Sequence, residues 1–469
     1  MQRKHLFIVT ITFLLASCRA GRDYQRPEVP LPEQFEANAG ADTTSIGDME
    51  WKQFFTDATL QSLIDKAVRD NFNLQLAMQR AEEARIYVKQ ARVNWTPVIV
   101  AQGTASTTIP SKNSLNGISL ENFLGTSHVE DYTLGATLSW ELDIWGRLRR
   151  QREAAVADFL ESFEAARAVK TTLVADIANT YFNLLMLDAQ LDVARKNLLL
   201  GDTVVNMMQL QKQAGQVTEL AVQQAIAQRE AAAQLVPQLE QEIAVQENTL
   251  RILTGELPGT INRNSLLNDF VVPAQLPTGI PASMVSRRPD VRASEMALKS
   301  ANARVGVAQG SMYPVLSISA TSGLNSFKSS NWFTMPASLF GTVAGNLAQP
   351  VLNQRRLQTQ LEVARVQREQ AVIRFRQSVL NAVGEVSNAL VRLEKLDSQQ
   401  RIAAERVQTL QQAVHNAGML FRSGLADYLE VITAQSNALQ AELVLADIRR
   451  QRLSAMVELY RALGGGWKE

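Results

Sequence analysis

The chain has 469 residues and a formal net charge of +1, with 47 Lys and Arg against 46 Asp and Glu. This balance excludes a strongly positive electrostatic field around the protein, which would favour binding to nucleic acid. The sequence is 46% hydrophobic but only 6% aromatic, and most of it is Ala, Leu, Val, Gln, Glu and Arg, which is typical of long helices packed on one another.

Residues 1–17 have the features of a secretory signal peptide. A basic start precedes the apolar stretch Leu6 to Leu15, which is too short to span a bilayer. The sequence LASC at residues 15–18 matches the bacterial lipobox, in which Cys18 is acylated and becomes the first residue of the mature chain. The alternative is a chance cysteine behind an ordinary signal peptide. Because Cys18 is the only cysteine, disulfides within the chain are excluded, and Arg19 after it favours sorting to the outer membrane.

The next part of the chain contains a tail and a first repeat. Residues 18–57 are rich in Pro, Gly and Glu and predict an extended tail without a core of its own. Residues 58–254 form repeat 1, and Pro97 ends its first helix. Thr218 is the expected N-cap of its last helix, in which Pro237 predicts a kink. The expected elements are helix 60–95, strands 98–109 and 132–144, and helices 147–213 and 218–253.

The strand 132–144 is the clearest local pattern. Apolar and polar residues alternate strictly along it, which predicts one apolar and one polar face. The apolar side is Tyr132, Leu134, Ala136, Leu138, Trp140, Leu142 and Ile144. At Gly146 and Arg147 the alternation stops, and a charged, Ala-rich helical pattern begins.

Residues 255–281 form a Pro-rich linker, and residues 282–464 form repeat 2 before the short tail 465–469. Subtracting 217 places Tyr313-Pro314 on Thr96-Pro97, and subtracting 209 places Gly424 on Gly215. The expected elements of repeat 2 are helices 282–312, 355–422 and 427–462, with strands 315–324 and 339–351. The offset of 209 superimposes residues from Glu362 on Glu153 to Leu459 on Leu250, and one offset over so long a stretch indicates an internal duplication.

Strand length and strand number together suggest a shared membrane barrel. A strand of about 13 residues is ~43 Å long, and a tilt of about 45° gives it a rise of ~30 Å, one hydrocarbon thickness. The smallest outer-membrane barrels have about eight strands, so that four strands per chain cannot close one. Several chains must therefore contribute, and three chains would give about twelve strands.

The helices favour a tube that continues such a barrel. Helix 147–213 would span ~100 Å, and helices 60–95 and 218–253 stacked end to end have a similar total length. A tube with parallel walls requires that the long helix and the stack of two short helices have equal lengths. The alternative is a pair of solvated coiled-coil hairpins without a lumen. The strand pairs and the lipobox favour the tube.

Several motifs resemble the outer-membrane factors of bacterial tripartite efflux pumps, which are TolC-like, in the NodT-type lipoprotein branch. The resemblance covers nearly all of the mature chain. It rests on DYQRP at 23–27, SWELDIWGR at 139–147, RRPDVR at 287–292 and GLADYLEV at 424–431. Arg22 stands where the family usually has Pro.

The resemblance implies a homotrimer with a 12-stranded β-barrel and a 12-helix periplasmic tunnel, a mixed α/β membrane protein. It also implies a periplasmic adaptor and an inner-membrane pump as partners, outer-membrane lipid around the barrel, and no cofactor apart from the lipid on Cys18. By position, Leu429 falls on a hydrophobic constriction, and Glu430 and Thr433 fall on acidic ring positions. Thr433 replaces the usual Asp, so that the acidic ring is weaker or rests on Glu430 alone.

Each of these positions also has a structural explanation. Asp427 and Glu430 have the spacing of a capping box, which is compatible with a place in the constriction. Gly215 and Gly424 are turn glycines. Trp140 and Trp145, beside Gly146, Pro97 and Pro314 at the junction of barrel and tunnel, are interfacial anchors, or Trp145 packs on the helices.

The leading functional hypothesis is a passive exit duct in the outer membrane for drugs or other small toxic compounds, served by an RND-type pump. The alternatives are a type I secretion channel for polypeptides and a lipoprotein scaffold without a pore. An enzyme is disfavoured because the mature chain has only His128 and His415, far apart, and no phosphate-binding loop or clustered acid–base set.

Overall fold

The computed structural model describes residues 20–32, 45–116, 118–119, 125–273 and 277–468. The signal peptide and Cys18 lie outside the described residues. The chain divides into two compact units. Unit 1 combines the segment before Glu28 with residues 82–160 and 295–373, and unit 2 combines residues 28–81, 161–294 and 374–469. Each unit therefore contains parts of both repeats.

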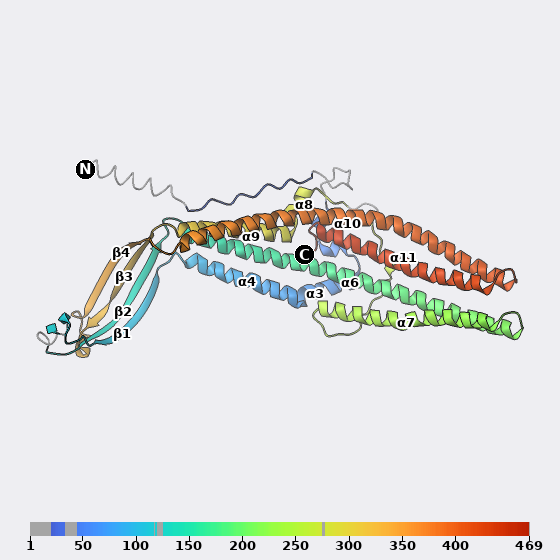
Figure 1. Cartoon of the computed structure of the whole chain (residues 1–469), viewed down its shortest axis with the longest axis horizontal. Helices are drawn as coiled ribbons and strands as arrows, with labels where there is room; N and C mark the ends of the chain where they lie inside the picture. Colours follow the sequence, from blue (N-terminus) through green and yellow to red (C-terminus); the bar gives the residue numbers. More distant parts are fainter. Residues whose placement is uncertain (1–19, 33–44, 117, 120–124, 274–276, 469) are drawn as a thin grey trace. The chain divides into compact units, whose positions relative to one another are not determined.

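Unit 1 contains one antiparallel four-stranded sheet in the order β1-β2-β3-β4 (Figure 1). The strands are β1 (Val98–Thr108), β2 (Val129–Leu142), β3 (Val315–Ser326) and β4 (Leu339–Ala348). Each repeat supplies one hairpin, and the pairing of β2 with β3 joins the two hairpins. Within the described part of the chain, β1 and β4 are the two edges of the sheet.

The predicted strands are confirmed, with corrected ends. β2 begins three residues before the predicted Tyr132, because Val129 pairs with Thr108 across the hairpin. It ends at Leu142 rather than 144, because the amide of Ile144 donates to the carbonyl of Leu142 in a turn at 2.8 Å. β3 runs two residues past the predicted 324, and β1 and β4 end before the predicted 109 and 351.

Four helices confirm the long-helix predictions and the duplication. α6 (Arg147–Gln213) and α10 (Arg356–Arg422) have 67 residues each, and α7 (Glu219–Leu253) and α11 (Tyr428–Ala462) have 35 each. All four helix ends in repeat 2 follow from those in repeat 1 by the predicted offset. α10 begins one residue after the predicted 355, because Arg355 has φ of 61°, outside the helical range.

The prediction of single helices over 60–95 and 282–312 was wrong. Each is two helices: α3 (Ala58–Asp70) and α4 (Phe72–Val93) in repeat 1, and α8 (Pro281–Arg287) and α9 (Pro289–Gly310) in repeat 2. The breaks fall at Asn71 and Arg288, which are equivalent under the offset of the strands.

Both break residues are extended rather than helical. Asn71 has ψ of 124° and Arg288 has ψ of 122°. The Asn71 side chain caps α4 by accepting from the amide of Leu74 at 3.0 Å. Arg288 precedes Pro289, and a residue before proline avoids the α region.

The side chains at the two breaks make the same contact in unit 2. Asn71 donates to the carbonyl of Leu253, the last residue of α7, at 2.9 Å. Arg288 donates to the carbonyl of Ala462, the last residue of α11, at 3.0 Å. Each break therefore satisfies a helix-end carbonyl that has no partner within its own helix.

The predicted tail 18–57 does have packed structure in its described part. Residues Ile46–Asp48 form η1 and Trp51–Phe54 form α2. Trp51 is 1% exposed and Phe55 is 3% exposed, and Phe54 stacks on Tyr460 of α11 with ring centroids 4.0 Å apart. The end of the chain is also packed, because Arg167 of α6 lies over the Trp467 ring at 4.4 Å.

No helix in the described part of the chain is both long enough and apolar enough to cross a membrane.

Candidate constriction and membrane junction

The two helical hairpins of unit 2 turn at Gly215 and Gly424, as predicted. These residues have φ of 75° and 71°, in the left-handed region that favours glycine. At the first turn, Gly215 donates to the carbonyl of Lys212 and Gln216 to that of Gln211. The second turn has the same pair of hydrogen bonds. This is the Schellman arrangement, which satisfies the last carbonyls of a helix that ends in glycine.

An apolar cluster holds the two turns together within unit 2. Its buried members come from both hairpins, which lie side by side in Figure 1. They are Val204, Met208, Val222, Ala225, Phe421 and Val431. Because Phe421 and Val431 flank the second turn, the first turn of α11 is fixed in rotation about its axis.

The predicted constriction residues lie on the opposite side of α11 from this cluster. Leu429 is 55% exposed, and Glu430, Thr433 and Asp427 are also exposed. Leu429 and Thr433 are four residues apart and Glu430 and Thr433 three apart, so that all three share one face of the helix. That face carries one leucine and one carboxylate that are free to line a passage.

The predicted capping box at the start of α11 was wrong. Asp427 occupies the N-cap position, but its side chain makes no capping hydrogen bond. The amide of Glu430 donates to the backbone carbonyl of Asp427 at 3.1 Å instead. In repeat 1 the equivalent Thr218 does cap α7, accepting from the amide of Ala221 at 3.4 Å.

The predicted junction residues come together where the sheet of unit 1 meets its helices. Trp140 donates to the carbonyl of Trp95, and Trp145 donates to the carbonyl of Pro314, both at 2.7 Å. Trp145 also stacks on Tyr313 with centroids 5.0 Å apart. Of the two explanations for Trp145, the structure therefore supports packing. Pro97 precedes β1 directly, as Pro314 precedes β3.

The turn from β2 to α6 depends on Gly146 and Asp143. Gly146 has φ of 76°, which reverses the chain at little steric cost. The Asp143 carboxylate accepts from the amides of Leu148 and Arg149, both at 2.9 Å. It thus satisfies free amides in the first turn of α6.

Two buried arginines, Arg150 in unit 1 and Arg288 in unit 2, organise the chain and were not predicted as functional. The half-buried Arg263 in the linker of unit 2 has a similar role. Arg263 contacts Asp188 of α6 through two hydrogen bonds, of 2.6 and 2.7 Å, and Glu247 of α7 at 2.6 Å. The linker is therefore fixed to both helices of the first hairpin. No local pattern distinguishes Arg150 and Arg263 from the many exposed arginines.

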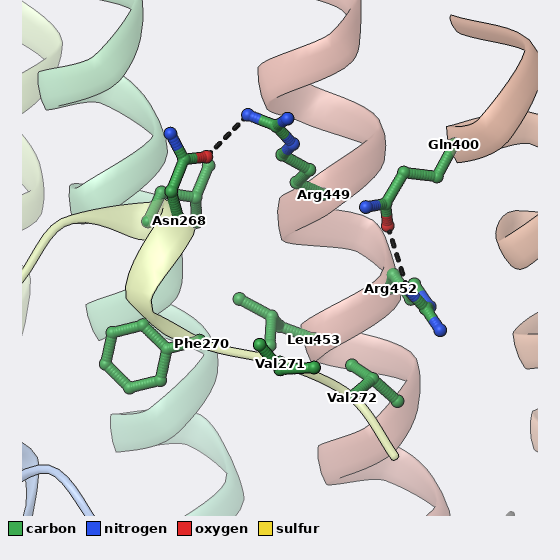
Figure 2. A pocket seen from close by; sticks show the side chains of 9 residues that line it. Asn268, Phe270, Val271, Val272, Gln400, Arg449, Arg452 and Leu453 are labelled. Carbon is green, nitrogen blue, oxygen red and sulfur yellow. Dashed lines mark hydrogen bonds between the residues drawn. The ribbon is translucent and has the colours of Figure 1, made fainter. Parts of the chain in front are cut away.

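A small recess lies where the linker crosses α11 (Figure 2). Arg449 donates to Asn268 at 2.5 Å and Arg452 to Gln400 at 3.2 Å. Burial lowers the pKa of Arg449 from its ordinary value. The recess measures about 170 Å³, below the ~300–1,000 Å³ of typical small-molecule pockets. It is too small to be the passage for a drug-sized compound.

Comparison with known families identifies the kind of protein in which this sheet and these helical hairpins occur. The model of the family "Outer membrane efflux protein" matches residues 63–256 and 280–465, which cover nearly all of both repeats. The chain belongs to this family. Its members are exit ducts of the outer membrane rather than enzymes. The predictions that this chain is an efflux duct and that it lies in the outer membrane are thereby confirmed.

Outer membrane efflux proteins of several systems are similar over the whole chain. The cation efflux system protein CusC of Escherichia coli O6:H1 is 29% identical over 98% of both chains. The protein named "Probable outer membrane lipoprotein SilC" of Salmonella typhimurium is 28% identical over 100% of both. The toluene efflux pump outer membrane protein TtgC of Pseudomonas putida is 29% identical, over 100% of this chain and 97% of its own.

Solved structures of outer membrane efflux proteins have the same fold. CusC, studied for its transmembrane channel formation, matches with a TM-score of 0.86 at 28% identity, over 96% of this chain and 100% of its own. The outer-membrane channel OprN matches with a TM-score of 0.88 at 26% identity over the same shares. The predicted fold class is thereby confirmed.

Proposed function

We propose that this outer membrane efflux protein works as a homotrimer, in which β4 of one copy pairs with β1 of the next. The observation that carries this proposal is the sheet of unit 1, whose edges β1 and β4 run antiparallel to one another. An unpaired edge in a membrane leaves backbone groups without hydrogen-bond partners. Three copies would close about twelve strands, above the minimum of about eight.

Aromatic residues support a membrane position for this sheet. Tyr132 and Trp332 contact each other at one end, with ring centroids 5.4 Å apart. Trp140 and Tyr313 lie at the other end. Aromatic residues at both borders of the apolar band are typical of outer-membrane barrels.

The proposed constriction of the duct is the exposed face of α11. Leu429 would provide an apolar ring and Glu430 a negatively charged one, while Thr433 contributes no charge. With a single acidic ring, we expect the duct to favour cations only modestly, because a ring of carboxylates is what gives a pore cation preference.

The proposed cargo consists of small molecules or ions, delivered by an inner-membrane pump of the RND type through a periplasmic adaptor. Support comes from the relatives, whose names refer to cations and toluene. The polypeptide channel has no such support. Because relatives with one fold serve chemically different cargo, the pump rather than the duct is expected to select it.

We also propose that Cys18 carries the lipid that anchors the N-terminus. The lipobox and the similarity to SilC support this. Labelling with palmitate in cells tests it, since Cys18→Ala should abolish the label. Label that persists in this variant would refute the lipobox.

The duct itself is tested with purified protein. We expect a heat-resistant trimer on gels, and ion conductance when that trimer is added to planar bilayers. A protein that remains monomeric contradicts the shared sheet, and a trimer without conductance contradicts the duct.

A further inference from the structure

The described chain begins with an extended segment that lies against the helices of unit 1. We call residues 20–26 the strap. Its contacts are with the start of α6, with residues 295–306 of α9 and with the turn after β2, and these parts all belong to unit 1. The constriction and the transport function do not account for the strap.

Arg150 is the centre of these contacts. Its side chain is 4% exposed and lies in the first turn of α6. It donates to the carbonyl oxygens of Ala20 at 3.2 Å and Gly21 at 3.1 Å, and to the carboxylate of Asp23 at 2.8 Å. A fourth hydrogen bond, to Glu153 at 2.7 Å, orients the guanidinium from its own helix. One buried side chain thus contacts three residues of the strap.

Two glycines allow the strap to approach this closely. Gly21 has φ of 78°, and a Cβ there would lie 2.6 Å from the Cα of Gly306 in α9. A Cβ on Gly306 would lie 2.9 Å from the Cγ of Arg150. Real Cβ atoms do not approach other atoms so closely, so that both positions require glycine. The backbones of Gly21 and Gly306 and the side chain of Arg150 therefore pack in direct contact.

The strap continues along α9 through side-chain contacts. Asn302 donates to the carbonyl of Arg22 at 3.0 Å. Tyr24 donates to Glu295 at 3.2 Å, and Arg26 forms an ion pair with the same carboxylate at 3.2 Å. Burial and the neighbouring Glu295 raise the pKa of Tyr24, so that its hydroxyl remains a donor at neutral pH.

The other end of the strap lies at the junction of sheet and helices. The amide of Ala20 donates to the carbonyl of Trp145 at 3.1 Å. Trp145 directly precedes Gly146, where the chain turns from β2 to α6. Cys18 precedes Ala20 by two residues, and two residues reach at most ~7 Å. A lipid on Cys18 therefore starts close to the membrane end of the helices.

We propose that Arg150 is a positioning residue that docks the strap and thereby holds the acylated N-terminus at the β2–α6 junction. This inference rests on the proposed lipid at Cys18. The acyl chains then enter the bilayer beside the sheet of their own copy. A free N-terminal tail of the same length would allow them to move away from it.

The test uses the full-length protein in cells fed with a palmitate analogue that carries a photoactivatable group. After irradiation, cross-links from the acyl chain to peptides of β1–β4 are measured by mass spectrometry. Arg150→Met removes all three strap contacts. Arg152→Met is the matched control, because it makes the same change at an exposed position two residues along α6. Arg150→Lys keeps the charge but cannot reach three acceptors at once.

We expect Arg150→Met to lower the yield of cross-links to the sheet several-fold at unchanged lipid incorporation, with an intermediate effect for Arg150→Lys and none for Arg152→Met. Amide hydrogen exchange in the strap should become about tenfold faster or more, since one hydrogen bond to a charged group is worth about that factor. Exchange in α6 should not change.

Gly21→Ala provides a second variant that leaves the helices intact. It changes only the strap, at a position where a Cβ does not fit, and should release the strap as Arg150→Met does. Unchanged cross-links and unchanged exchange in both variants would overturn the proposal, as would equal acceleration throughout α6. Absence of lipid label from the wild-type protein would instead refute the acylation. Amide hydrogen exchange in the strap would then still show whether Arg150 docks the strap.

Discussion

Replacing Arg288 with Met tests how strongly the break between α8 and α9 stabilises the fold. Its side chain is 4% exposed. It makes two hydrogen bonds to Asp290, of 3.0 and 2.6 Å, one to Glu385 at 2.8 Å and one to the carbonyl of Ala462 at 3.0 Å. Methionine fills a similar volume but donates to none of these acceptors.

The expected cost follows from the exposure of the partners. Removing one member of a fully buried ion pair costs about 3–5 kcal/mol. The side chains of Asp290 and Glu385 are 47% and 38% exposed, so that water can solvate both carboxylates after the substitution. The carbonyl of Ala462 loses a partner, which costs about 1–3 kcal/mol when no water replaces it. We therefore expect a loss near the lower limit, about 3 kcal/mol.

The assay is thermal unfolding of the purified protein in detergent, followed by circular dichroism. Arg304→Met is the control, since Arg304 is 58% exposed and its pair with Asp158 lies at the surface, where such pairs contribute about 1 kcal/mol or less. Asn71→Ala, the equivalent change in repeat 1, should cost about 2 kcal/mol, from one lost cap and one unpaired carbonyl. If Arg288→Met unfolds at the same temperature as Arg304→Met, the reasoning is refuted.

Three further predictions concern the turn at Gly424, the charge of Asp290 and the constriction. Gly424→Ala should destabilise by about 1–2 kcal/mol, because φ is positive there, whereas Gly384→Ala inside α10 should stabilise by up to about 1 kcal/mol. In both cases an added Cβ meets nothing within 4 Å, so that equal effects in thermal unfolding would contradict the conformational explanation. Burial acts to raise the pKa of Asp290, but hydrogen bonds and the charge of Arg288 outweigh it and lower the pKa. This contribution to stability is present above the unfolded value of about 3.9 and is lost as pH falls through the folded pKa. The unfolding temperature of the wild type should therefore fall more steeply below about pH 4 than that of Asp290→Asn. Parallel curves of unfolding temperature against pH would argue against this contribution of Asp290. Leu429→Ala combined with Glu430→Ala should raise single-channel conductance, while Leu220→Ala, at the equivalent position of α7 with 56% exposure, should not. An unchanged conductance in the double variant would place the constriction elsewhere.

The sequence allowed the strands and the long helices to be predicted because their periodicity is local. The start of α6 at Arg147 and the end of α7 at Leu253 agree with the predictions. The breaks at Asn71 and Arg288 were missed although each has a local sign, an N-capping residue in one case and the residue before a proline in the other. Helical periodicity continues across both breaks and concealed them.

Packing of the tail and the role of Arg150 required contacts over long distances in the sequence. Trp51, Phe54 and Phe55 form an aromatic group that is rare in this chain, and it could have indicated a buried segment. Arg150 has no such sign, since Arg149 and Arg152 beside it are of the same type and exposed. Only the fold, which places Gly306 and the strap next to Arg150, distinguishes them.

The duplication also explains why only repeat 2 can carry a carboxylate at the position of Glu430. Glu430 is exposed in the first turn of α11, whereas its equivalent in α7, Ala221, is 0% exposed. A carboxylate at position 221 would be buried without a partner, which is costly. The preceding leucines, Leu429 and Leu220, are equally exposed at 55% and 56%, so that apolar contact alone does not distinguish the repeats. The two hairpins have kept the same length and the same glycine turn. They differ in how the first turn of the returning helix packs, and this difference allows a carboxylate at position 430 of repeat 2 where repeat 1 has the buried Ala221.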